Sequence, residues 1–325
     1  MKAVLCTSLD GIESLTIEDI DPPSPGAGEV VVKVRAAALN FFDTLITRGA
    51  YQHKPELPFS PSGEICGTVL SCGPDVKDFS PGDRVMSYLG WGGAREQVLV
   101  QASQLVPVPD TVADEVAASL SITYGTAIHG LRDRAGLVAG ETVAILGAAG
   151  GAGLAAIEIA KQLGAHVIAV ASSKAKLDTC VGAGADQVFD YKTGDLKAGL
   201  RTLTSGRGVD VVYDCVGGDQ TEQAIRAMAW GGRFLVVGFA SGTIAKLPLN
   251  LLLVKGVSAV GVFWGEAIKR DPDSHRANME QLMDWVARGK LVPVIDQTFP
   301  LESAREALGV IAQRKAIGKV VLVVE

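Results

Sequence analysis

The feature that most constrains this chain is a cluster of glycines between an apolar strand and a helix. In the segment TVAILGAAGGAGLAAIEIAKQLG, residues 142–164, the turn holds Gly147, Gly150, Gly151 and Gly153. A phosphate needs backbone N–H donors with no Cβ in the way, and the N-terminus of a helix favours its charge. The strand–turn–helix context predicts dinucleotide binding, although the spacing G-x-x-G-x-x-G departs from G-x-G-x-x-G. A purely structural turn and a methyltransferase loop are the alternatives.

Strands and helices alternate after this turn, which is typical of a doubly wound α/β domain with a parallel sheet. The expected strands are 142–147, 166–171, 186–191, 209–217, 233–239 and 257–263. The expected helices are 153–163, 174–184, 196–205 and 221–230. The apolar stretch 251–265 is interpreted as part of an exposed sheet edge, which must be paired to avoid aggregation.

The N-terminal part of the chain differs, because short apolar strands and Pro/Gly turns follow one another there. The expected strands lie at 28–40, 64–73, 83–89 and 95–110, before helical spacing begins at residue 114. After a charged helical region at 272–289, the tail returns to strand, helix and strand at 294–300, 301–313 and 318–324. We expect this tail to complete the β-rich domain.

The end of the second alternating strand, VIAVASSKAK, discriminates between cofactors. NAD-binding chains and methyltransferases commonly carry an acid there to hold ribose hydroxyls. This chain instead has Ser172, Ser173, Lys174 and Lys176. Hydroxyl and ammonium groups suit an additional phosphate, so the segment favours NADPH. The two serines could also cap the next helix, and the two interpretations are compatible.

Bulk properties exclude several classes of protein. The 325 residues suit two domains, and 48% apolar residues can fill their cores. The net charge of −6 comes without a basic run, so nucleic acid is not expected as a partner. The five cysteines form no C-x-x-C pair, which argues against a disulfide framework and favours the cytoplasm. Neither a signal peptide nor a membrane span is expected.

Segments throughout the chain resemble those of one superfamily. They are AALNFFDTLITRGAY, PFSPSGEICGTVLSCG, FSPGDRV, TYGTAIHGL, DYKTGD, VDVVYDCVGG, GGRFLVVGFASG and GKVVLVV, together with the glycine turn. The chain resembles the medium-chain dehydrogenase/reductase superfamily and, within it, the zinc-independent NADPH:quinone oxidoreductases. The resemblance implies a GroES-like catalytic β domain at 1–122 and 267–325 and a Rossmann NADP-binding domain at 123–266. It also implies an active site in a cleft between the two.

The resemblance bears on metal binding as well. Zinc-dependent relatives carry Cys where this chain has Asn40, and G-H-E where it has Ser62-Gly63-Glu64. No Cys or His lies between residues 104 and 126, where a third ligand is expected, and the four-cysteine structural zinc lobe is missing. Catalytic zinc needs three protein ligands, so no metal is expected. Without a Lewis acid, the acceptors that fit are those already activated by conjugation, such as quinones and enones.

Catalytic roles are implied for three residues near the lost zinc position. Asn40 could bond the nicotinamide side or a substrate carbonyl, Asp43 could orient Asn40 or Arg48, and Tyr51 could donate to a substrate oxygen. Each residue has a structural alternative. Asn40 and Asp43 could serve only to fix the loop, and Tyr51 could pack as an aromatic lid.

Cofactor contacts are implied at the positions that match the family. Gly150, Gly151, Ala152 and Gly153 are expected at the pyrophosphate, and Ser172, Ser173 and Lys176 at the 2′-phosphate. The other expected cofactor contacts are Asn40, Thr123, Tyr191, Cys215, Val216, Gly238, Phe239, Val262, Phe263 and Lys319. Phe239 and Phe263 could equally be core residues, and Lys319 a strand-edge charge.

Three functions stay open on the sequence alone. The first is the NADPH-dependent reduction of quinones or similar conjugated carbonyl compounds. The second is the NADPH-dependent reduction of C=C bonds in enones, enals or enoyl thioesters. The third is a non-enzymatic role, as in crystallin-like or RNA-binding members that bind NADPH. Relatives pair through the edge of the Rossmann sheet, so a homodimer is also expected.

Overall fold

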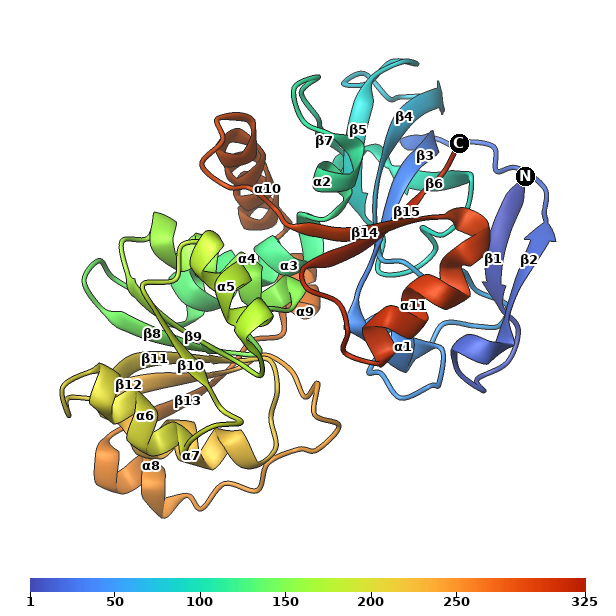
Figure 1. Cartoon of the computed structure of the whole chain (residues 1–325). Coiled ribbons are helices and arrows are strands. Elements are labelled where there is room, and N and C mark those ends of the chain that lie inside the picture. The colour runs from blue at the N-terminus through green and yellow to red at the C-terminus, as the bar shows by residue number, and fades with distance from the viewer. The chain divides into compact units, whose positions relative to one another are not determined.

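The computed structural model describes all residues from Met1 to Glu325, and they form two compact units (Figure 1). Unit 1 contains residues 1–122, 273–289 and 293–325, and unit 2 contains residues 123–272 and 290–292. The return to unit 1 thus falls at 272/273, later than the expected boundary at 266/267. Helix α9 (Trp264–Arg270) belongs to unit 2 because the Trp264 ring packs against Gly125, where an added Cβ would lie 2.8 Å from the ring.

A parallel sheet of six strands forms the centre of unit 2, in the order β10-β9-β8-β11-β12-β13. Numbered along the chain, this order is 3-2-1-4-5-6, which is the doubly wound arrangement that the alternation predicts. Ligands of such sheets bind at the carboxyl ends of the strands, where the order reverses between β8 and β11. The strands are β8 (Thr142–Leu146), β9 (His166–Ala171), β10 (Gln187–Asp190), β11 (Val209–Asp214), β12 (Met228–Val236) and β13 (Ser258–Gly261).

Helices flank this sheet and bury its apolar side chains. One core joins the central strands to α6, α7 and α8 through residues such as Val170, Leu200, Ile225 and Leu251. The helices are α3 (Ser121–Ile128), a π-helical turn (His129–Arg134), α4 (Gly151–Gln162), α5 (Lys174–Gly182), α6 (Leu196–Leu203), α7 (Asp219–Ala227), α8 (Asn250–Lys255) and α9. The predicted α/β alternation is therefore present, with α4 beginning at Gly151 and not at residue 153.

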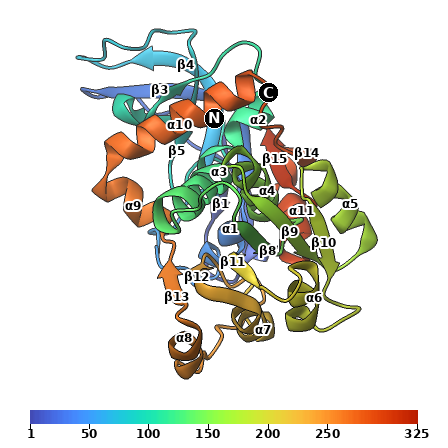
Figure 2. The same cartoon turned by 90° about the vertical axis from the view of Figure 1, so that its left-hand side faces the viewer.

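Two predicted elements of unit 2 differ from the structure, one in type and one in its bounds. Residues 251–255 were expected in an edge strand, but they belong to helix α8, which ends at Gly256 with a left-handed φ of 60°. A glycine in this conformation is a common helix stop, and the sequence carries that signal. The predicted helix 221–230 ends at Ala227, because Met228 already pairs in the sheet. Figure 2 shows β13 at the edge of the sheet, with α8 next to it in the chain.

Unit 1 is built on a seven-stranded sheet that brings distant parts of the chain together. Its order is β14-β15-β3-β4-β5-β7, and β6 pairs with β3. The C-terminal strand β15 runs antiparallel to β3, as the red strand beside the blue one in Figure 1 shows, so the tail completes this sheet. The strands are β1 (Lys2–Cys6) and β2 (Leu15–Asp19), which form a separate pair, β3 (Glu29–Leu39), β4 (Glu64–Cys72), β5 (Arg84–Tyr88), β6 (Gln97–Gln101), β7 (Val106–Pro107), β14 (Ile295–Pro300) and β15 (Lys319–Val323).

Four helices complete unit 1, and the sequence analysis missed one of them, α1. They are α1 (Phe41–Ile46), α2 (Asp114–Ala118), α10 (Pro272–Ala287) and α11 (Ala304–Ala312), with 3-10 turns at Ile12–Ser14, Ala102–Gln104 and Leu301–Ser303. Helix α1 was missed because it has only six residues. Its start carries a signal nonetheless, because the Asp43 carboxylate accepts a hydrogen bond from the Asn40 N–H, as in a capping box.

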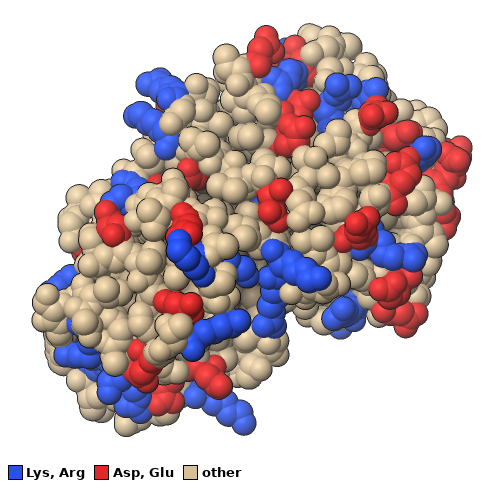
Figure 3. Space-filling view, viewed as in Figure 1, with Lys and Arg blue, Asp and Glu red and all other residues tan.

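The surface carries charges of both signs. Acidic and basic side chains are interspersed on the face shown in Figure 3, without a large basic patch. None of the helices combines the length and the apolar character that a membrane span requires.

Candidate active site

Glycine shapes the turn after β8 in unit 2 at two positions. Gly147 has a φ of 71°, in the left-handed region, and an added Cβ there would lie 2.8 Å from Val216 Cγ2. Gly153 lies in the first turn of α4, where an added Cβ would lie 2.4 Å from the Gly147 oxygen and 2.5 Å from Ala148 Cα. The turn and the helix can approach each other this closely only with glycine.

The start of α4 leaves backbone donors for a ligand. Gly150 caps the helix without a side-chain acceptor, so the N–H groups of Gly151, Ala152 and Gly153 have no intrahelical partner. At Gly150 an added Cβ would meet nothing nearer than 3.6 Å, so the space beside the turn is open. Free N–H donors with a helix dipole behind them fit the pyrophosphate of a dinucleotide.

Two further loops reach the same edge of the sheet. Backbone N–H groups of the loop after β12 donate to the carbonyl oxygens of Cys215 and Val216, at 3.1 and 2.8 Å. Gly238 and Phe239 lie in that loop, and Phe239 is 38% exposed, which argues against its being a core residue. Burial raises the pKa of the Cys215 thiol, so this cysteine lacks the thiolate character of a nucleophile.

The last predicted contacts of unit 2 lie around the end of β13 and the start of α3. Val262 is buried, whereas Phe263 is 44% exposed and so is not a core residue either. Gly130, which follows α3, faces Val262, because an added Cβ there would lie 3.4 Å from Val262 Cγ1. Thr123 is buried in α3 itself. Gly130 and Val262 therefore lie next to each other near the carboxyl end of β13.

Asp214 was not singled out from the sequence, yet it holds one of these loops in place. Its Oδ1 accepts hydrogen bonds from the N–H groups of Val216 and Gly217 at 2.7 and 2.9 Å, and its Oδ2 accepts one from Thr221 Oγ1 at 2.8 Å. Asp214 is buried and ends β11. An acidic residue at the carboxyl end of a buried strand is the signal that could have found it.

The residues expected at a 2′-phosphate cluster at the end of β9. Ser173 caps α5, because its Oγ accepts from the Lys176 N–H at 3.4 Å. Tyr191 is tied to the same strand end through its N–H, which donates to the Ala171 oxygen at 3.2 Å. The capping role of Ser173 agrees with the structural alternative and leaves the anion site possible, because a helix N-terminus attracts both. Ser172 precedes this cap and is half-buried.

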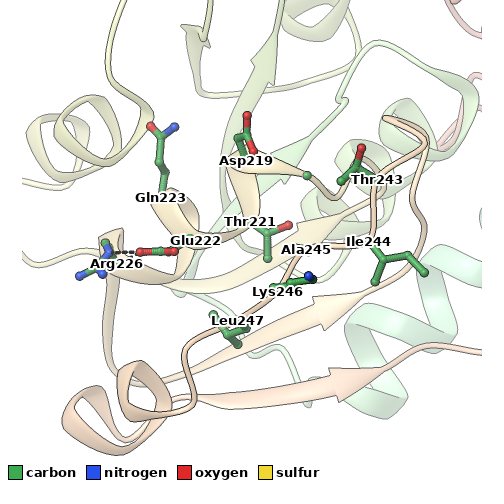
Figure 4. Close-up of a pocket in the computed structure, with 11 residues that line it drawn as sticks. Asp219, Thr221, Glu222, Gln223, Arg226, Thr243, Ile244, Ala245, Lys246 and Leu247 are labelled. Carbon is green, nitrogen blue, oxygen red and sulfur yellow. Dashed lines mark hydrogen bonds and ion pairs between the residues drawn. The ribbon is translucent and has the colours of Figure 1, made fainter.

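A hollow of about 410 Å³ lies elsewhere in unit 2, beside α7 and the loop 243–247 (Figure 4). Charged side chains of both signs line it, including Glu222 and Arg226, which pair with each other at 2.7 Å, and Lys246. It contains none of the residues predicted for cofactor or substrate. We assign no role to it.

In unit 1, Asp43 organises the loop that precedes α1. Its Oδ2 accepts from the Asn40 N–H at 2.8 Å, and its Oδ1 accepts from the Ser62 N–H at 2.9 Å. Asp43 thus orients the backbone of Asn40, and it does so without Arg48, which is exposed. Burial raises the pKa of Asp43 to about 7, although the two N–H donors favour the ionised form.

The Asn40 side chain belongs to a buried group that we call the amide network, formed by Asn40, Glu64 and Lys319. Lys319 Nζ donates to Asn40 Oδ1 at 2.7 Å, to Glu64 Oε1 at 2.8 Å and to the Leu39 oxygen at 3.2 Å. Asn40 Nδ2 donates to Glu64 Oε1 at 2.9 Å. The side chains of Lys319 and Glu64 are only 4% and 0% exposed.

The hydrogen bonds of Lys319 bear on its expected role. It was expected as a cofactor contact or as a strand-edge charge, but it is buried in β15. An ammonium group has three N–H donors, and the three acceptors of the network use all of them. A polar contact of Lys319 with the cofactor would have to compete with these three hydrogen bonds, and it stays a prediction.

Tyr51 is half-buried near Asp43. Its ring lies 5.4 Å from that of Phe42 and 6.0 Å from that of His53, measured between centroids. Burial and the charge of Asp43 raise the pKa of the Tyr51 phenol, which keeps it protonated as a donor. Tyr88, at the end of β5, was missed by the sequence analysis. Burial and the neighbouring Tyr51 raise its pKa as well.

The donor set around Asn40 does not suit a metal ion. Nowhere in the structure do three or more His, Cys, Asp or Glu side chains gather as a metal site would require. At Glu64, the carboxylate already accepts from Lys319, whose positive charge repels a cation. Zinc requires three protein ligands, and the amide network offers a single carboxylate.

Comparison with known proteins yields two family models that together cover most of the chain. The model described as alcohol dehydrogenase GroES-like domain matches residues 26–110. The model described as zinc-binding dehydrogenase matches residues 151–288. Quinone oxidoreductase-like protein 2 homolog of Nematostella vectensis is 41% identical over 99% of this chain and 88% of its own length.

Solved structures agree with these matches. A probable oxidoreductase from Mycobacterium abscessus is 40% identical, covers 99% of this chain and 98% of its own, and superposes with a TM-score of 0.89. Escherichia coli quinone oxidoreductase, solved in complex with NADPH, is 28% identical, with coverages of 99% and 100% and a TM-score of 0.91. The two-domain fold predicted from the sequence, GroES-like and Rossmann, is thereby confirmed.

Proposed function

Because the chain belongs to the quinone oxidoreductase family of the medium-chain dehydrogenase/reductase superfamily, we propose that it reduces quinones or similar conjugated carbonyl compounds with NADPH and without zinc. The observation that carries the proposal is the amide network. At the position where zinc-dependent relatives bind their metal, this chain has a buried ammonium–carboxylate pair bonded to an amide.

The absence of a zinc site decides which acceptors fit. An alcohol or an isolated carbonyl needs a Lewis acid to polarise its oxygen. A quinone or an enone is already activated by conjugation, and its developing charge spreads over the conjugated system. Hydrogen-bond donors are then sufficient to stabilise the oxygen that gains charge. We therefore do not extend to this chain the zinc binding that the description of one matching family model names.

NADPH is the cofactor that the residues of unit 2 favour. The start of α4 fits a pyrophosphate, and no carboxylate occupies the end of β9, where Ser172, Ser173 and Lys176 follow. The Escherichia coli relative was solved with NADPH. When bound, NADPH supplies a hydride from C4 of its nicotinamide ring.

The residues of this chain have the following proposed tasks. Backbone N–H groups of Gly151 to Gly153 bind the pyrophosphate, and Lys176 with Ser173 binds the 2′-phosphate. Asn40 donates from Nδ2 to an oxygen of the acceptor or of the nicotinamide amide, and Asp43 fixes the backbone of Asn40. Tyr51 donates a hydrogen bond to a substrate oxygen.

The test is a panel of acceptors assayed with both cofactors. NADPH oxidation is followed by absorbance with 1,4-benzoquinone, with an enone of similar size and with neither. We expect turnover of the quinone with NADPH, and a much higher apparent KM for NADH. Turnover of the enone without any quinone would assign the chain to C=C reduction. NADPH binding without turnover of either acceptor would favour the non-enzymatic role.

We also propose a homodimer formed through the edge of the unit 2 sheet. Large apolar side chains are exposed close to that edge, with Trp230 at 80% and Leu253 at 79%. Large apolar side chains that are exposed next to one another are typical of protein interfaces. Sedimentation velocity should give the mass of two chains, and Leu253→Lys should shift the species toward a monomer. A monomeric wild type would reject this assembly.

A further inference from the structure

We propose that Lys319 and Glu64 are positioning residues that hold the Asn40 amide in a single orientation, so that it offers an N–H, and not its oxygen, to a ligand. The inference deepens the proposed function and rests on it only for the identity of that ligand. The acceptor of this N–H is an oxygen that gains negative charge in the reaction, as a quinone or enone oxygen does.

The orientation follows from the chemistry of lysine. An ammonium group donates hydrogen bonds and accepts none. The Asn40 atom that lies 2.7 Å from Lys319 Nζ must therefore be the oxygen. The amide nitrogen is then the atom that faces Glu64 Oε1, at 2.9 Å. A flipped amide would place N–H groups against the ammonium and its oxygen against the carboxylate, with two repulsive contacts in place of two hydrogen bonds.

Glu64 also fixes the orientation of the Asn40 amide, because its carboxylate lies against the amide nitrogen. Its Oε1 accepts from Lys319 and from Asn40, and its Oε2 accepts from the Ile122 N–H at 2.8 Å. Both oxygens therefore act purely as acceptors. Ile122 is followed directly by Thr123, a predicted contact of the nicotinamide, so the same carboxylate also fixes the chain on which that residue lies.

Nδ2 of Asn40 carries two hydrogens, and the network uses one of them. The second hydrogen is the donor that the amide offers to a ligand. The buried ammonium polarises the amide through its oxygen, and this strengthens the remaining N–H as a donor. Lys319 thereby supplies part of what a metal supplies in zinc-dependent relatives, namely fixed positive charge near the reacting oxygen, without touching that oxygen.

Folding alone gives little reason to keep this pair. Buried ion pairs can often be replaced by apolar residues without loss of stability. Lys319 begins a strand whose next residues are Val320, Val321 and Leu322, all buried. A lysine at this place is therefore better explained by its effect on Asn40 than by the stability of the sheet.

A double-mutant cycle tests the inference. Asn40→Ala, Lys319→Met and the double variant are assayed with NADPH and 1,4-benzoquinone, and kcat and KM are compared. Removal of one oxyanion donor lowers kcat by about 100–1000-fold. We expect a similar loss for Lys319→Met, with little change in KM for NADPH, and at most a further 3-fold loss when Lys319→Met is added to Asn40→Ala. Losses that simply multiply would overturn the inference, because Lys319 would then act independently of Asn40.

Glu64→Gln provides a second variant of nearly the same shape. The glutamine NH₂ group would face either the Ile122 N–H or the donors of Lys319 and Asn40, so neither orientation satisfies the network. We expect kcat to fall at least 10-fold with a folded protein. Lys2→Met is the matched control for Lys319→Met, because Lys2 forms an exposed ion pair with Glu302 at 2.6 Å in the same unit, and the kcat of this control should stay unchanged. An unchanged kcat in folded Glu64→Gln would count against the inference.

A measurement on the unaltered protein covers the case in which these variants do not fold. The chain has three asparagines, Asn40, Asn250 and Asn278, so selective ¹⁵N labelling gives three side-chain amide signals. One Nδ2 proton of Asn40 should be shifted downfield and protected from exchange, unlike those of exposed Asn250. Asn40 protons resembling those of Asn250 would overturn the fixed orientation. This result does not depend on turnover, so it separates a failure of the inference from a failure of the proposed function.

Discussion

The glycine turn of unit 2 and the amide network of unit 1 build a binding site in opposite ways. In the function that we propose, the turn binds the cofactor with backbone N–H groups, and two of its positions, Gly147 and Gly153, leave no room for a side chain. The network uses three buried side chains that occupy one another's donors and acceptors, and leaves a single N–H for a ligand. The turn is therefore sensitive to atoms added at Gly147 and Gly153, whereas the network is sensitive to a change of polarity in its side chains.

The largest expected effect concerns added atoms in the turn. Gly153→Ala places a Cβ 2.4 Å from the Gly147 oxygen, and a backbone atom cannot move aside as a flexible side chain can. We expect a loss of about 3 kcal/mol in the free energy of unfolding, together with loss of NADPH binding. Urea unfolding and a fluorescence titration with NADPH measure the two effects.

Gly182→Ala is the matched control for this substitution. Gly182 lies in helix α5, and an added Cβ there meets nothing within 4 Å. Alanine favours a helix over glycine by about 1 kcal/mol, so the control should be slightly more stable and bind NADPH normally. Equal effects of the two substitutions would show that close approach in the turn does not matter.

A change of polarity in unit 1 should have the next largest effect. Asp43→Asn keeps the shape but replaces one oxygen by NH₂, so the N–H of Asn40 or of Ser62 loses its acceptor. A buried donor without a partner costs about 1–3 kcal/mol. Urea unfolding at pH 5 should show this loss, and a variant as stable as the wild type would refute the role of Asp43 in holding the loop.

The same variant makes a prediction about pH. The pKa of Asp43 is about 7 in the folded protein, above its value of about 3.9 in an unfolded chain. Between these values the folded protein binds more protons, so the contribution of Asp43 to stability decreases as pH rises from 4 to 7. The stability advantage of the wild type over Asp43→Asn should therefore shrink between pH 5 and pH 7.5. An advantage that grows with pH would contradict the raised pKa.

A more selective effect, on one of the two cofactors, is expected of a substitution at the end of β9. Lys176→Ala should weaken NADPH about 10–100-fold, because a charge-assisted phosphate contact is worth roughly 1.5–3 kcal/mol, and should leave NADH nearly unaffected. Lys174→Ala is the control, since Lys174 is exposed and pairs with Asp178 at 2.6 Å. Titrations with both cofactors decide the matter, and equal losses for NADPH and NADH would show that Lys176 does not bind the phosphate.

The glycine turn and the amide network also differ in how far the sequence could predict them. The glycine turn is local, and its strand, turn and helix follow one another within residues 142–164, so pattern and spacing were sufficient to find it. The α/β alternation of unit 2 and most strands of unit 1 were predicted for the same reason. Helix α8 was missed because its apolar run was interpreted as part of the edge strand that follows it.

The amide network could be predicted only in part. Asn40 was located through the family resemblance, but its partner Lys319 lies 279 positions along the chain, and only the pairing of β15 with β3 brings the two together. No local sequence pattern indicates a contact between residues so far apart in the chain. Lys319 was consequently assigned to the cofactor, and Glu64 was noted as the remnant of a zinc motif without a role of its own.

The central claim is that this chain reduces conjugated acceptors with NADPH and no metal. The most direct test is to assay NADPH oxidation by 1,4-benzoquinone before and after exhaustive chelation, with zinc quantified in the same samples. We predict an unchanged rate and well under one zinc per chain throughout. A rate that falls on chelation and returns with stoichiometric zinc would contradict the account.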